Sequence, residues 1–236
     1  MADVTSTILE ATRPPFLRCF PYRDAITGSF VLMRDIAVVS MLALCLASPA
    51  PLLAQDTTTA APTAALGYAA EHGNADAQFD LGSMFRNGRG VTQDDAQAAV
   101  WYRKAAEQGH AHAQFDLGVM YEEGEGVAQD DTQAAVWYRK AAEQGIADAQ
   151  FNLGSMYDEG QGVEQDDAQA VAWYRKAAEQ GHAGAQNGLG AMYAEGRGVP
   201  QDKTQAIAWF RKAAQQGNDV AETNLHRLGV LLPTDK

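Results

Sequence analysis

Apolar and small residues recur at helical spacing through most of the chain. In the stretch 75–87, Ala77, Leu81 and Met84 lie three or four positions apart, and glycines follow at positions 88 and 90. This spacing predicts an amphipathic helix over 75–87 that ends in a glycine turn.

A second helix is predicted to open at Asp94 and to run through Trp101 to Gly109. Asp94 and Gln97 have the spacing of a capping box, in which the aspartate accepts from first-turn amides and the glutamine reaches back. The two segments form a helical hairpin, and no strand pattern appears anywhere in the sequence.

The hairpin is repeated along the chain with a period of 36 residues. Trp101 recurs at this period as Trp137, Trp173 and Trp209, in four full repeats at 74–109, 110–145, 146–181 and 182–217. Residues 66–73 match the end of a repeat and residues 218–232 match the start of another, so half repeats flank the array.

A hairpin of this length is too short to fold alone, so each repeat must bury its Trp and Leu partly against its neighbour. The predicted fold is therefore all-α: an α-solenoid of stacked helix-turn-helix repeats over residues 66–232. Glycine in the middle of a helix costs about 1 kcal/mol relative to alanine. Close helix–helix approach would explain its recurrence at Gly82, Gly118, Gly154 and Gly190.

The repeated pattern A-x-A-Q-x-x-L-G-x-M-Y-x-x-G-x-G-V-x-Q-D, followed by W-Y-R-K-A-A-E-Q-G, resembles the Sel-one-like repeat family, relatives of tetratricopeptide repeats. The resemblance covers residues 66–232 and implies a right-handed α-solenoid. It also implies an adaptor, envelope-signalling or host-interaction role. Some exported relatives carry a disulfide in every repeat, which this chain cannot form. The penicillin-binding or β-lactamase-like activity of those cysteine-rich relatives is therefore a weaker expectation for this chain.

The first 54 residues have a different character from the repeats. Arg34 precedes an apolar stretch from Ile36 to Ala47, which prolines and Ala54 follow. This pattern is typical of a secretory signal peptide over 33–54 that is cleaved after Ala54. The apolar stretch is too short for a permanent membrane span.

We therefore expect an exported protein, periplasmic or secreted, whose translation starts at Met1 or Met33. A lipid anchor at Cys45 is an alternative. Residues 55–65 are expected to form a flexible linker, and 233–236 a short tail.

Cysteine and charge exclude several functions. Cys19 and Cys45 both precede the predicted cleavage point, so the mature chain would have no disulfide and no cysteine nucleophile. The formal net charge of −12 argues against nucleic acid as a partner.

The positions that differ between repeats mark one side of the first helix, because their spacing traces a single helical face. By resemblance to tetratricopeptide repeats, this is the concave face. We expect it to form an acidic groove for a protein or peptide with a basic segment, with Arg86 as its one permanent cation. The predicted partner-binding residues are Asp76, Phe79, Asp80, Arg86, His112, Phe115, Asp116, Glu122, Glu123, Asp148, Phe151, Asn152, Asp158, Glu159 and Glu195.

Two alternatives to this groove stay open. The acids could simply keep the surface soluble, and the Phe side chains could contact neighbouring repeats. On the second helix, the recurring pair Arg103-Lys104 indicates support of the fold, with Arg103 and Glu107 one helical turn apart. The functional alternative is that these pairs bind an anion or a phospholipid.

Signals for catalysis are weak. His110 and His112 are two positions apart, where helical side chains diverge, so no metal site is predicted. No nucleophile, base or cofactor fingerprint appears, and we expect neither cofactor nor enzymatic activity. The predicted function is therefore a monomeric, non-catalytic binding protein. The alternatives are an enzyme or enzyme inhibitor of cell-wall metabolism, acting on peptidoglycan or β-lactams, and a passive scaffold that assembles in tandem.

Overall fold

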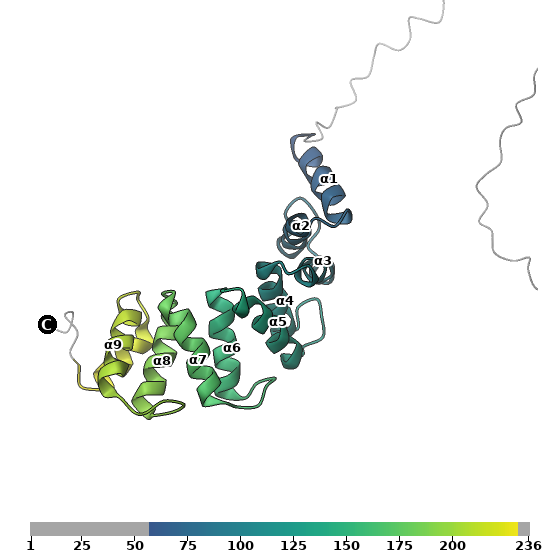
Figure 1. The fold of residues 1–236 in the computed structure, drawn as a ribbon. Coiled ribbons are helices and arrows are strands. Elements are labelled where there is room, and N and C mark those ends of the chain that lie inside the picture. Colours follow the sequence, from purple (N-terminus) through teal and green to yellow (C-terminus); the bar gives the residue numbers. More distant parts are fainter. Residues whose placement is uncertain (1–56, 231–236) are drawn as a thin grey trace, which may run out of the picture. The chain divides into compact units, whose positions relative to one another are not determined.

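The computed structural model of this protein describes residues 57–230, which form a stack of helices (Figure 1). The predicted N-terminal extension and signal peptide within 1–54, and the tail 233–236, lie outside the described residues.

Each full repeat contributes a first and a second helix of nearly equal length. The first helices are α2 (Ala75–Asn87), α4 (Ala111–Glu123), α6 (Ala147–Glu159) and α8 (Ala183–Glu195). The second helices are α3 (Asp95–Glu107), α5 (Asp131–Glu143), α7 (Asp167–Glu179) and α9 (Lys203–Ala214), and the half repeats contribute α1 (Thr57–Glu71) and α10 (Asp219–Arg227).

Extensive contacts join only helices that are consecutive in sequence. Residues 57–230 contain no strand. The predicted all-helical stack of 36-residue repeats is therefore confirmed. The helix α1 begins at Thr57, so residues 57–65 are helical where the sequence predicted a flexible linker. Their alanine-rich composition explains the difference, because alanine has the highest helix propensity.

The helix ends follow the predicted signals, with one correction. Gly88 ends α2 in a left-handed conformation, and an Asp94 carboxylate oxygen accepts from the Gln97 backbone amide at 2.9 Å. The backbone amide of Asp94 donates to the carbonyl of Phe85 at 3.0 Å and not to the Gln97 side chain. The second half of the predicted capping box is therefore wrong. The last turn of α2, which contains Phe85, supplies that bond.

The mid-helix glycines make room for an aromatic ring. A Cβ atom on Gly154 would lie 2.7 Å from Cδ1 of Tyr174, which belongs to the paired second helix. The close approach predicted for these glycines is confirmed, and the contacting group is a side chain rather than a helix backbone.

Tryptophan side chains connect each repeat to the one before it. Trp137 of α5 is 7% exposed and packs in a cluster with Ala98 of α3 and Leu117 of α4. The ammonium of Lys140 lies 3.8 Å from the centre of the Trp137 ring. The prediction that each Trp needs a neighbouring repeat for its burial is confirmed.

A recurring buried glutamine forms a further connection that the sequence analysis did not identify. Gln150 of α6 is 5% exposed. Its side-chain nitrogen donates to the carbonyl of Ala142 in the preceding repeat at 3.0 Å, and its oxygen accepts from Gln180 at 2.7 Å. The same pair of bonds forms at Gln78, Gln114 and Gln186. We call these four residues the glutamine ladder.

Candidate partner-binding face

The structure places the predicted partner-binding residues on the first helices α2, α4, α6 and α8, and none of them is buried. We call these residues the first-helix face. The opposite side of the same helices carries Ala77, Leu81 and their equivalents, which are buried. The division into a variable exposed side and a constant buried side therefore follows the predicted helical spacing.

The Phe side chains of this face contact neighbouring repeats. The ring of Phe79 stacks on His110 of the next repeat, with centroids 4.6 Å apart, and lies 5.6 Å from the ring of Tyr102. Phe151 makes the same contacts with His182 and Tyr174. Both rings are half-buried between repeats, so the alternative that the Phe side chains contact neighbouring repeats is confirmed for Phe79 and Phe151.

Two arginines pair with acids of this face and a third contacts a serine on it, where the sequence analysis counted only Arg86. The Arg86 guanidinium lies 4.0 Å from Asp116, 3.8 Å from Glu123 and 3.2 Å from Glu125. Arg89, in the turn after α2, donates to the hydroxyl of Ser83 at 3.0 Å.

Arg197 lies in the turn after α8 and was also missed. It pairs with Asp158 of the preceding first helix, with Glu195 at 2.8 Å and with Asp167 at 3.3 Å. Its contact with Asp158 raises the pKa of the Arg197 guanidinium, which stays charged. Arginines in the turns therefore reach the face that the helices present.

Tyrosine hydroxyls hold several of the half-buried acids. The Tyr138 hydroxyl donates to Glu122, and the Tyr174 hydroxyl donates to Asp158 at 3.4 Å. Burial, followed by the nearby carboxylate, raises the pKa of both tyrosines. Burial also raises the pKa of Asp116, against the opposing effect of Arg86. Glu122 and Asp158 therefore contribute to the packing between the two helices of a repeat, and Asp116 contributes to the contact with the preceding repeat.

His110 is an N-cap rather than a helix-surface residue. Its Nδ1 atom accepts from the backbone amide of Ala113 at 3.1 Å, and its Nε2 atom lies 3.5 Å from Asp76. His112 is exposed, with its ring centroid 6.2 Å from that of His110. Within residues 57–230, no group of three or more histidine, cysteine or acidic side chains is arranged to hold a metal ion.

Comparison with known proteins decides the family. The model of the Sel1 repeat matches four consecutive segments, 75–110, 111–146, 147–182 and 183–218. The chain belongs to the Sel1 repeat family. Sel1 repeats typically mediate protein–protein interactions. No curated protein matches the chain.

Two solved structures of Sel1 repeat proteins are similar over most of the solenoid. One is a protective antigen of uropathogenic Escherichia coli with the same repeat fold, at 46% identity and a TM-score of 0.66. The match covers 71% of this chain and 37% of the antigen. The other is a Sel1 repeat protein from Oxalobacter formigenes, at 46% identity and a TM-score of 0.64, with coverage of 70% and 48%. The chain thus matches less than half the length of each.

The second helices of the Sel1 repeats use their recurring basic pair for packing. Arg103 donates to the Tyr121 hydroxyl of the next repeat, and Lys104 lies 3.7 Å from the centre of the Trp101 ring. The predicted support of the fold is confirmed. Arg103 makes this bond to the next repeat in place of the expected pairing with Glu107 along its own helix.

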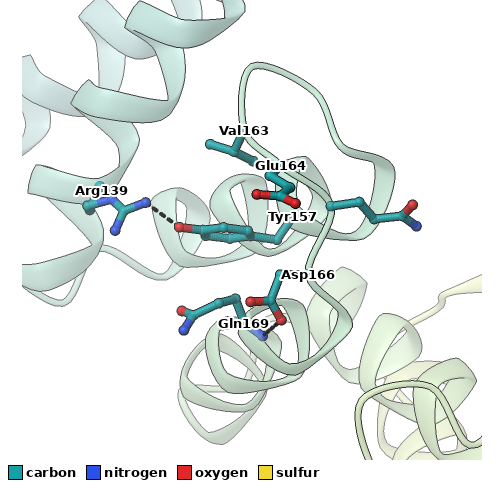
Figure 2. A pocket seen from close by; sticks show the side chains of 7 residues that line it. Arg139, Tyr157, Val163, Glu164, Asp166 and Gln169 are labelled. Carbon is teal, nitrogen blue, oxygen red and sulfur yellow. Dashed lines mark hydrogen bonds between the residues drawn. The ribbon is translucent and has the colours of Figure 1, made fainter.

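A cavity of about 600 Å³ lies at the turn of the third Sel1 repeat (Figure 2). It is lined by Arg139, Tyr157, Val163, Glu164, Gln165, Asp166 and Gln169. The sequence analysis did not identify it, because its walls come from two adjacent repeats. Among residues 57–230, no helix is long and apolar enough to cross a membrane.

Proposed function

We propose that this Sel1 repeat protein is an exported, non-catalytic binding protein whose first-helix face holds a partner protein through a basic segment. Its role would be that of an adaptor, an envelope-signalling component or a host-interaction protein. The observation that carries the proposal is the excess of carboxylates on this face over the arginines that reach it.

The acids divide into two groups with different tasks. Asp116, Glu122 and Asp158 are half-buried and bonded to tyrosines or arginines. Asp80 and Glu159 are exposed and have no basic partner within residues 57–230, and Asp148 faces only His182. The second group is free to pair with lysine or arginine side chains of a partner.

Three exposed carboxylates, one on α2 and two on α6, can attract a basic segment and orient it along the stack. Each exposed pair contributes only about 0–1 kcal/mol, so affinity would come from several contacts in a preformed surface. The charges would chiefly set the association rate and its salt dependence.

Export is supported by the residues that precede the repeats. The apolar stretch 36–47 after Arg34 has the character of a signal peptide, and both cysteines lie before the predicted cleavage point. We place the mature protein in the periplasm, with secretion as the alternative.

Affinity capture from envelope extract tests the proposal. A face variant carries Asp80→Lys, Asp148→Lys and Glu159→Lys, which spare the acids bonded to tyrosines or arginines. A control variant carries Glu107→Lys, Glu143→Lys and Glu179→Lys, which make the same change in net charge on the exposed second helices. Mass spectrometry identifies what each retains, and circular dichroism checks that each is folded.

We expect one or more proteins to be retained by the parent and by the control variant, and lost from the face variant. Retention of the same proteins by all three would refute the assignment of this face. Loss from both variants would show that net charge, rather than the first-helix face, governs binding.

A further inference from the structure

The cavity at the turn of the third repeat is built from two adjacent repeats. Arg139 comes from α5, Tyr157 from the end of α6, and the remaining residues from the turn and the start of α7. The Arg139 guanidinium donates to the Tyr157 hydroxyl, which connects the two repeats across one wall (Figure 2). Its volume of about 600 Å³ lies within the range of ligand sites, about 300–1,000 Å³.

One lining residue distinguishes this turn from the other three. Glu164 occupies the position that Thr92, Ala128 and Pro200 fill in the other repeats. The flanking Val163, Gln165 and Asp166 are the same in every repeat, as is Gln169. Since the turn accepts four different residues here, folding does not require glutamate.

The charges of the cavity favour a cation. One Asp166 carboxylate oxygen accepts from the backbone amides of Ala168 and Gln169, at 2.9 and 3.0 Å, so this carboxylate is fixed in place. Glu164 is exposed and has no bonded partner within residues 57–230. The carboxylates of Glu164 and Asp166 lie on either side of the Tyr157 ring in Figure 2. Arg139 supplies the one opposing charge.

We propose that this cavity binds a lysine or arginine side chain of a partner polypeptide, with Glu164 as the residue that gives the third repeat its selectivity. A polypeptide fits better than a free amine, because the cavity also presents the exposed side-chain amide of Gln169. That amide can pair with a backbone amide next to the cationic side chain. The site is separate from the first-helix face and does not depend on it.

Nuclear magnetic resonance titration of the purified protein tests this site. The probe is the tripeptide acetyl-Gly-Lys-Gly-amide, and its uncharged control replaces lysine with norleucine. Cadaverine serves as a free amine without peptide bonds. Glu164→Gln removes the charge at the cavity with the shape retained, and Glu179→Gln makes the same change in net charge on the exposed side of α7.

We expect the lysine tripeptide to cause saturable shifts in the backbone resonances of residues 163–169. Loss of a charge-assisted hydrogen bond in the Glu164→Gln protein should weaken binding about ten-fold, while the Glu179→Gln protein should bind like the parent. The norleucine tripeptide and cadaverine should both bind more weakly than the lysine tripeptide.

Three results would overturn the proposal. The first is the absence of saturable shifts at residues 163–169. The second is equal affinity of the parent and the Glu164→Gln protein. The third is binding of cadaverine as tight as that of the lysine tripeptide, which would make the site one for free amines.

Discussion

The glutamine ladder offers a sharp test of how neighbouring repeats are held together. Replacing Gln150 with methionine keeps the length and most of the volume of the side chain, and removes its bonds to Ala142 and Gln180. Replacing it with alanine removes the same bonds and, in addition, one buried methylene group and the volume of the carboxamide. Comparison of the two variants separates hydrogen bonding from packing.

The magnitudes follow from the local structure. A hydrogen bond contributes about 0.5–1.5 kcal/mol net, so two bonds allow about 1–3 kcal/mol. The Ala142 carbonyl keeps a bond from the Gly145 amide at 3.1 Å, and the exposed Gln180 can bond to water. The cost of Gln150→Met should therefore lie near the lower end, about 1–2 kcal/mol. A buried methylene adds about 0.8 kcal/mol, so Gln150→Ala should cost about 2–3 kcal/mol.

Urea denaturation followed by circular dichroism gives the free energy of unfolding of each variant. Gln161→Ala, at an exposed turn position, is the control and should change it by less than about 0.5 kcal/mol. If Gln150→Met also stayed within about 0.5 kcal/mol of the parent, the argument that these bonds connect the repeats would be refuted.

Two further predictions concern single positions of the first helices. Burial raises the pKa of Asp116, so its ionised form costs stability in the folded state. Asp116→Asn, which copies Asn152 of the next repeat, should therefore increase the free energy of unfolding at pH 7. This gain in stability should shrink as the pH falls toward about 3.9, where Asp116 is protonated in the unfolded chain as well. A loss of stability of the Asp116→Asn protein at pH 7 would show that the ion pair with Arg86 outweighs burial. Gly154→Ala should cost about 1–3 kcal/mol because the new methyl group would meet the Tyr174 ring at 2.7 Å. Gly67→Ala, with open space around its Cβ position, should raise the free energy of unfolding by about 0.5–1 kcal/mol. Thermal unfolding measures both substitutions, and equal effects would contradict this reasoning.

Local signals predicted the helices well because the determinants lie within a few residues of each boundary. Gly88 takes the left-handed conformation that ends α2, and the Asp94 side chain caps α3. The period of Trp101 and its equivalents then required stacking, since no single hairpin could bury them. The fold class therefore followed from the sequence.

Contacts between repeats were harder to predict, because they join residues that are distant in sequence. Gln150 is constant in every repeat, which marks it as structural, but its partners at 142 and 180 follow only from the folded geometry. Arg103 was assigned to Glu107 along its own helix, whereas the hydroxyl of Tyr121 in the next repeat takes the bond.

The candidate site shows the same limit. Helical spacing identified which side of each first helix is exposed, but it could not show that turn residues fold back over that side. Arg197 reaches Asp158 from the turn after α8, and Phe79 stacks on a histidine of the next repeat. Both contacts reduce what the surface offers to a partner, and the unbonded carboxylates that remain are fewer than the sequence predicted.

The central claim is that exposed carboxylates of the first-helix face hold a basic partner. Its most direct test is the affinity of the captured partner for the parent and the face variant, measured from about 50 to about 500 mM NaCl. We predict that the parent's affinity falls at least about ten-fold over this range, and that any residual binding by the face variant changes little. An affinity of the parent that does not depend on salt would contradict the claim.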